Sequence, residues 1–165
     1  AFFISIIFIV ATGGSLLSFE QMLKVSGLLI LTVSLASAMN MLFVLFTNTL
    51  SAFSTLSTII GTIIGFLAGV YVPIGALPTF AQNLIMVFPI SHSSLLLRDT
   101  FMAESINKVF AGAPVEFIEQ YKITYGVIYE MNGTTLSTTT SLAVIIGSIF
   151  IFSLFAIIIF KKKNK

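Results

Sequence analysis

The sequence predicts an all-α, polytopic helical membrane protein, and three observations lead to this fold class. The 165-residue chain is 57% hydrophobic. Only 8% of its residues are charged, against about 25% in ordinary soluble domains. No Asp, Glu, Lys or Arg lies between Lys24 and Arg98, or between Glu130 and Lys161. Because about 20 apolar residues span the hydrocarbon core, these uncharged stretches are long enough for several membrane-spanning helices.

About four transmembrane helices are expected, with short polar links between the first three. They cover residues 1–17, 26–46, 54–72 and 138–160, and the links are "SFEQMLK" and "TNTLSAF". The chain opens inside an apolar segment, with no Met and no basic region before it. We therefore expect a single transmembrane domain, residues 1–165, that is a fragment of a longer protein, and not a chain that opens on a signal peptide.

The basic residues predict the orientation. Four of the eight Lys and Arg residues lie in the tail, residues 161–165, directly after an apolar helix. Residues 91–137 carry three basic and five acidic residues. Because short cytoplasmic segments hold the excess of Lys and Arg, the tail is expected in the cytoplasm and residues 91–137 outside. This places a multi-pass protein in the cell (plasma) membrane, and the high Ile and Phe content favours a bacterial origin.

The stretch from Tyr71 to His92, "YVPIGALPTFAQNLIMVFPISH", predicts a re-entrant hairpin on the outer side. The orientation requires both of its ends to lie outside, and residues 77–90 are too few to cross a membrane. The residues expected to form its turns are Pro73, Gly75, Pro78 and Pro89. Backbone at membrane depth needs hydrogen-bond partners, which Gln82 and Asn83 can supply. The alternative is a helix lying flat on the outer surface.

Residues 91–137 are expected to form amphipathic helices at the membrane–water interface. One helical face carries Leu95, Met102, Ile106 and Val109. Tyr121, Tyr125 and Tyr129 recur every fourth residue and predict an aromatic stripe. Ser91, His92 and Asp99 are the residue types of a catalytic triad. Their closeness in sequence favours serine helix caps and an interfacial histidine instead.

Small and polar residues mark the expected spans. Gly61, Gly65 and Gly69 recur every fourth residue and predict a close helix contact. That contact lies either within one subunit or at a dimer or moving interface. Asn40 lies in mid-span, where it either links helices by a hydrogen bond or lines a substrate path. No Asp, Glu, Lys or Arg lies in any expected span, which disfavours a proton-driven pump.

The residue types present exclude several kinds of site. The sequence has no cysteine, a single histidine and no paired carboxylates, so we expect neither a metal site nor a bound cofactor. It lacks a GxxxxGK[ST] phosphate-binding loop, so we do not expect an enzyme that hydrolyses ATP. Half of its basic residues lie in the tail instead of spreading over a folded face, which excludes nucleic acid as a partner.

The segment "GFLAGVYVPIGALPTFAQNLIMVFPISHSSLLLRD" resembles the signature region of ABC-2 type transporter permeases, the membrane subunits of ATP-binding cassette exporters. The positions that carry the resemblance are Gly69, Pro73, Leu77, Pro78, Pro89, His92 and Arg98. The resemblance implies that the chain is the C-terminal part of such a permease, helices three to six with the third truncated. The cytoplasmic coupling helix would then be absent. Residues 91–137 are longer than the matching region of compact family members.

The resemblance implies export of a hydrophobic or amphipathic substrate, of the drug, lipid, peptide or polysaccharide class. It implies two partners in the lipid bilayer: a cytoplasmic ATP-binding cassette ATPase subunit that holds ATP and Mg²⁺, and a second permease copy or homologue. The glycine stripe and the hairpin would be moving and gating surfaces. Asn40, Gln82 and Asn83 would lie on the translocation path. The alternatives are an ion-coupled or passive transporter and a non-transport assembly or immunity factor.

Overall fold

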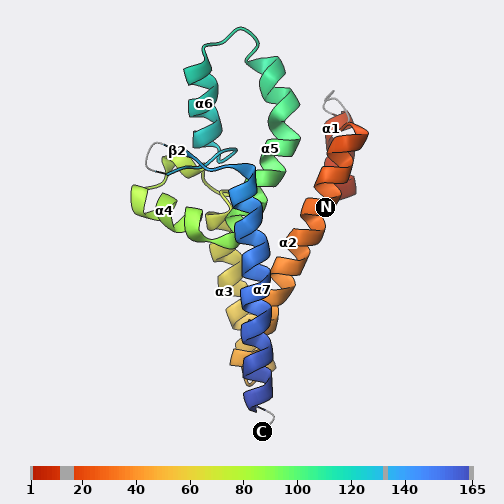
Figure 1. Ribbon diagram of the computed structural model, residues 1–165, viewed down its shortest axis with the longest axis vertical. Helices are drawn as coiled ribbons and strands as arrows, with labels where there is room; N and C mark the ends of the chain where they lie inside the picture. The colour runs from red at the N-terminus through yellow and green to blue at the C-terminus, as the bar shows by residue number, and fades with distance from the viewer. Residues whose placement is uncertain (1, 12–16, 132–133, 164–165) are drawn as a thin grey trace.

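The computed structural model describes residues 2–11, 17–131 and 134–163 of the chain. These residues form an elongated bundle of helices, with two further helices projecting from one end (Figure 1). We call this end the α5–α6 end, after helices α5 (Pro89–Val109) and α6 (Val115–Thr124). The opposite end, where the last helix finishes in Lys161, Lys162 and Lys163, is called the lysine end.

Among the described residues, three helices are long and apolar enough to cross a membrane: α2 (Phe19–Phe46), α3 (Leu50–Leu67) and α7 (Thr138–Lys163). Helix α4 (Thr79–Val87) and α5 are bent by 90° at Phe88, and together they make a fourth candidate if the pair is one broken span. Large apolar side chains face outward along the spans, and Phe150 of α7 is 72% exposed. Hydrocarbon would cover them, so the prediction of a helical membrane protein is confirmed.

The N-terminal helices differ from their predicted boundaries. Helix α1 (Phe2–Ala11) is short, and residues 12–16 of the expected first span lie outside the described residues. Helix α2 begins at Phe19, so the expected link is helical. A capping box starts it: Gln21 N donates to the Ser18 hydroxyl at 3.2 Å, and Ser18 N donates to Gln21 Oε1 at 2.8 Å. The link was misread because its charges, Glu20 and Lys24, form an ion pair one helical turn apart.

The third and last spans also differ from their predicted boundaries. Helix α3 begins and ends earlier than expected, since Thr49 caps its N-terminus and Gly69, with φ +64°, turns the chain out of the helix. Helix α7 begins at Thr138, as expected, but continues through Lys163. The Lys163 ammonium donates to Leu45 O at 3.2 Å and to Asn48 Oδ1 at 3.1 Å. This side chain therefore ties α7 to the loop between α2 and α3.

The core lies where α2, α5 and α7 pack together (Figure 1). Its buried residues are Leu35, Met39, Ile74, Ile85, Leu95, Leu96, Tyr129 and Ile145. Helix α3, all of whose residues are described, has no buried side chain. The third span is therefore the one held least by packing.

The region after residue 90 is a helical hairpin followed by a short ladder. Helix α5 runs away from the bundle and α6 returns beside it (Figure 1). The strands β1 (Glu130–Met131) and β2 (Thr134–Thr135), which the sequence did not predict, pair antiparallel. The predicted apolar face of α5 is buried only in part, since Ile106 is 3% and Val109 76% exposed.

The predicted tyrosine stripe is divided between two environments. The rings of Tyr121 and Tyr125 are in contact, with 4.6 Å between their centroids and an angle of 37° between their planes. Tyr129 lies beyond the end of α6 and is buried in the core. Because α6 ends at Thr124, the helical spacing that predicted one stripe does not extend to Tyr129.

Replacing Gly75 with Ala is expected to destabilise the protein. The new Cβ would lie 2.8 Å from the backbone Cα of Thr124, where α6 meets the turn before α4. Overpacking of this kind costs about 1–3 kcal/mol, and thermal unfolding of the detergent-purified protein measures it. Gly147→Ala in α7 is the control, because a Cβ there meets no atom within 4 Å. Equal melting temperatures for the two variants would contradict the contact.

Candidate functional site

Prolines divide the segment that follows α3 into short helical pieces. Pro73 precedes the 3-10 turn η1 (Ile74–Ala76), Pro78 precedes α4, and Pro89 is the first residue of α5. Proline fits these positions because the first helical N–H groups have no partner within the helix. Helix α4 lies across the direction of α3 and α7 (Figure 1). We call η1, α4 and the first turn of α5 the hairpin; its depth in the bilayer stays a prediction.

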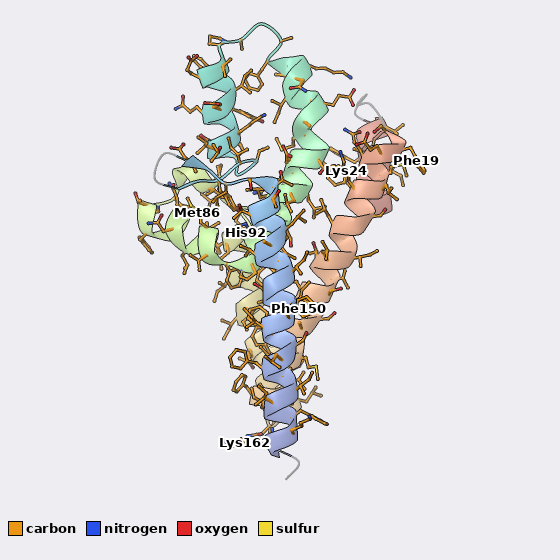
Figure 2. All side chains as sticks on the ribbon, in the orientation of Figure 1. Phe19, Lys24, Met86, His92, Phe150 and Lys162 are labelled. Atoms are coloured by element: carbon orange, nitrogen blue, oxygen red, sulfur yellow. The ribbon has the colours of Figure 1, made fainter. Side chains whose placement is uncertain are left out.

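His92 lies at the centre of a buried polar cluster between the hairpin and α7. Its Nε2 is 2.8 Å from Met86 O, and its Nδ1 is 3.1 Å from Ser141 Oγ. A carbonyl oxygen only accepts, so Nε2 donates to Met86, and the Nδ1 of a neutral ring accepts from the Ser141 hydroxyl. Figure 2 shows His92 close to α7, with Met86 on the adjoining α4. One side chain thus joins α4, α5 and α7.

Tyr129 and Ser91 complete this cluster. The Tyr129 hydroxyl donates to Ser91 O at 3.1 Å, and its ring meets the His92 ring edge-on at 5.8 Å. Burial raises the pKa of Tyr129 to about 12, so the phenol keeps its proton and donates. The Ser91 hydroxyl donates to the carbonyls of Ile85 and Phe88, at the end of α4.

The interpretation of Ser91 as a helix cap is wrong, and His92 lies inside the protein; its depth relative to the membrane–water interface stays a prediction. Helix α5 already begins at Pro89, with no side-chain cap, and His92 is only 1% exposed. Pro89 supplies the helix start, and both side chains are therefore inside the first turn and face the core. His92 bonds to Met86 and Ser141, not to Asp99, so these residues do not form a triad.

Arg98 connects α5 to the end of α3. Its Nη2 donates to the carbonyls of Ala68 and Gly69, where a cation also meets the negative end of the α3 dipole. A Cβ added to Gly69 would lie 3.2 Å from Arg98 Nη1, and a Cβ added to Gly126 would lie 3.0 Å from the same atom. Both glycines have positive φ, so the turns on each side of the guanidinium require glycine. Gly69 and Arg98, at the two ends of the motif, are therefore in contact.

A cleft of about 210 Å³ lies between α2 and α3, beside the start of α5. Its lining is mostly apolar, with two polar side chains, Asn40 and Ser57. Asn40 Nδ2 donates to Ala36 O of its own helix at 3.0 Å, so this amide does not link helices as one reading of the sequence expected. Ser57 as a whole is half-buried, and its Oγ atom is out of reach of solvent, with no hydrogen-bond partner among the described residues. Gly61 lines the same cleft, with open space where a Cβ would be.

The predicted site residues do not converge on one place. Only Gly61 of the glycine stripe faces the cleft, because the Tyr71 ring fills the space beside Gly65 and Gly69 lies beyond the end of α3. Gln82 Nε2 donates to Leu77 O at 2.8 Å, and Asn83 is exposed on α4. Neither amide lines the cleft that holds Asn40. A translocation path through all three amides is not supported by this arrangement.

Sequence reasoning missed Ser141 and Met86 as the partners of His92. Ser141 is one of several hydroxyl residues in "STTTS", and nothing in that run distinguishes it. Within residues 2–11, 17–131 and 134–163, no group of three His, Cys, Asp or Glu side chains could hold a metal ion. The hydrogen bonds of His92 in the buried cluster join α4, α5 and α7.

Comparison with known proteins gives no relative: no protein family, no curated protein and no solved structure matches the chain. The resemblance to ABC-2 type permeases thus rests on the motif residues alone.

Removing the Ser141 hydroxyl is expected to destabilise the protein by about 1–2 kcal/mol, because buried Nδ1 of His92 loses its donor. The same change in a His92→Phe background should cost little, since the partner is already gone. Unfolding free energies of the two single variants and the double variant measure this coupling. Thr139→Ala, an exposed neighbour on α7, is the control. Additive effects of Ser141→Ala and His92→Phe would show that the bond contributes nothing.

Proposed function

We propose that the chain is part of the permease subunit of an ATP-driven exporter of the ABC-2 type. The observation that carries this proposal is the contact between Gly69 and Arg98 across the hairpin. These residues stand at the two ends of the motif on which the resemblance rests. Their contact makes the motif one structural unit, in which a span is followed by a proline-bounded hairpin that is tied back to it.

The hairpin is bonded on both sides. On one side, Arg98, further along α5, bonds to the end of α3, where the hairpin begins. On the other side, His92 in the hairpin bonds to Ser141 of α7. Because buried hydrogen bonds are costly to break, the hairpin should move together with these helix ends. This supports a gating role, in which the hairpin follows tilts of the spans.

The cleft between α2 and α3 is the place where the bundle can change shape. Helix α3 buries none of its side chains, and Gly61 leaves open space in the cleft. In the proposed mechanism, ATP binding to a separate cytoplasmic ATPase subunit tilts the spans and widens this cleft. Its apolar lining with two polar side chains favours a hydrophobic or amphipathic substrate. ATP and Mg²⁺ would be held by the partner subunit.

Export requires the lysine end to be cytoplasmic, with the α5–α6 end outside the cell. The lack of cysteine in this chain allows single-cysteine labelling to test this orientation. A membrane-impermeant maleimide added to intact cells is expected to label Val115→Cys, at the exposed start of α6, and not Ser51→Cys, at the exposed start of α3. Lysed cells are the control, in which both positions should react. Labelling of position 51 alone in intact cells would reverse the orientation.

The proposal is tested by identifying what the intact protein binds in its own cell. After tagging and gentle solubilisation, we expect a stoichiometric ATP-binding cassette ATPase subunit to co-purify, with ATP hydrolysis in the eluate. A Walker-A lysine variant of that subunit should keep the complex and abolish hydrolysis. No ATPase in several detergents would contradict the proposal. Activity that depends on an ion gradient would then favour the ion-coupled alternative, and function that survives loss of the hairpin would favour an assembly or immunity factor.

A further inference from the structure

A second and larger hollow lies at the α5–α6 end of the bundle. Here α2 diverges from α5 and α7 (Figure 1), and the three helices line a groove of about 550 Å³. Lys24 and Asp99 line it from α2 and α5, while Leu28, Leu31 and Leu142 make it apolar. Figure 2 shows Lys24 near the upper end of α2, where α2 and α5 diverge. The proposed translocation cleft lies elsewhere, between α2 and α3, so this groove is a separate feature.

The charged groups of the groove are not all used by the fold. Lys24 pairs with Glu20 at 2.8 Å, and both side chains are largely exposed. The Thr100 hydroxyl donates to Leu96 O, and the Gln21 side chain accepts from Ser18 N. Asp99 is half-buried, and among the described residues it has neither an ion pair nor a hydrogen bond. The groove thus offers one unpaired carboxylate beside an exposed ammonium–carboxylate pair.

The polarity of the groove changes along the bundle axis. Lys24 lies in the second turn of α2, and Leu31 lies seven residues further along, about 10 Å deeper. Leu142 lies one turn inside α7 from Thr138, and Gly27 leaves open space where a Cβ would be. The groove is charged near the ends of the spans and apolar further into the bundle. A lipid in a bilayer has the same order, with its headgroup at the interface and its acyl chains in the hydrocarbon core.

We propose that this groove binds a phospholipid with a primary amine in its headgroup, from the leaflet at the α5–α6 end. Asp99 takes the ammonium, Lys24 takes the phosphate, and one acyl chain lies along Leu28, Leu31 and Leu142. The ammonium donates hydrogen bonds to the Asp99 carboxylate, which a quaternary choline cannot do. The inference does not depend on the exporter proposal, because the groove requires no ATPase and no second subunit.

The test uses the intact purified protein without any ATPase, in mixed micelles titrated with phosphatidylethanolamine, phosphatidylcholine or phosphatidylglycerol of the same acyl chains. Native mass spectrometry counts bound lipid, and the melting temperature reports the gain in stability. We expect phosphatidylethanolamine to bind most tightly. Asp99→Asn should weaken its binding about tenfold, the effect of losing one charge-assisted hydrogen bond, and should leave phosphatidylcholine unchanged.

Two further variants separate lipid binding from folding. Glu116→Gln removes an exposed carboxylate on α6, away from the groove, and should bind phosphatidylethanolamine like the parent protein. Gly27→Phe should fill the groove and abolish the preference while leaving the fold intact, because its Cβ points into open space. Equal binding of the three lipids, or a preference that survives both Asp99→Asn and Gly27→Phe, would overturn the proposal. So would finding no bound lipid at all.

Discussion

The structure depends on one constraint: backbone carbonyls exposed by a broken helix in a membrane protein must find donors within the protein. The chain breaks its helices repeatedly between Leu67 and Pro89, and side chains close the resulting gaps. The donors and their acceptor carbonyls are Arg98 to Ala68 and Gly69, Gln82 to Leu77, Ser91 to Ile85 and Phe88, and His92 to Met86. Polar residues that suggested a functional site in the sequence therefore serve as hydrogen-bond donors to backbone carbonyls.

This constraint separates the rigid part of the molecule from the part that can move. The hairpin lies between two sets of hydrogen bonds, from Arg98 of α5 to the end of α3 and between His92 and Ser141 of α7, so it is a poor place for independent motion. Helix α3 has no buried side chain of its own and borders a cleft with α2. A change of shape that starts at α2 and α3 would carry the hairpin with it. Gating by the hairpin would then be a consequence of helix tilt.

Hydropathy predicted the membrane fold and the start of α7 because burial in lipid needs only length and composition. It did not predict the start of α2, which the capping box at Ser18 moves into the expected link. The glycine spacing assumed that α3 continues to Gly69, but the positive φ there ends the helix first. The pairing of His92 with Ser141 joins residues 49 positions apart. No local pattern records such a contact, since it depends on how α5 and α7 pack.

The adjacent residues Arg98 and Asp99 differ in whether the fold uses their charge, and this difference bears on function. Arg98 is occupied by the carbonyls at the end of α3, and its charge is part of the fold. Asp99 lines the groove between α2, α5 and α7, and it has no hydrogen-bond or ion-pair partner in the described part of the chain. Charge-assisted hydrogen bonds are stronger than neutral ones, and a ligand with an ammonium group can form with Asp99 a bond that no described residue makes. A charge in a groove that pairs with no other side chain is thus a better guide to ligand binding here than the most polar stretch of sequence.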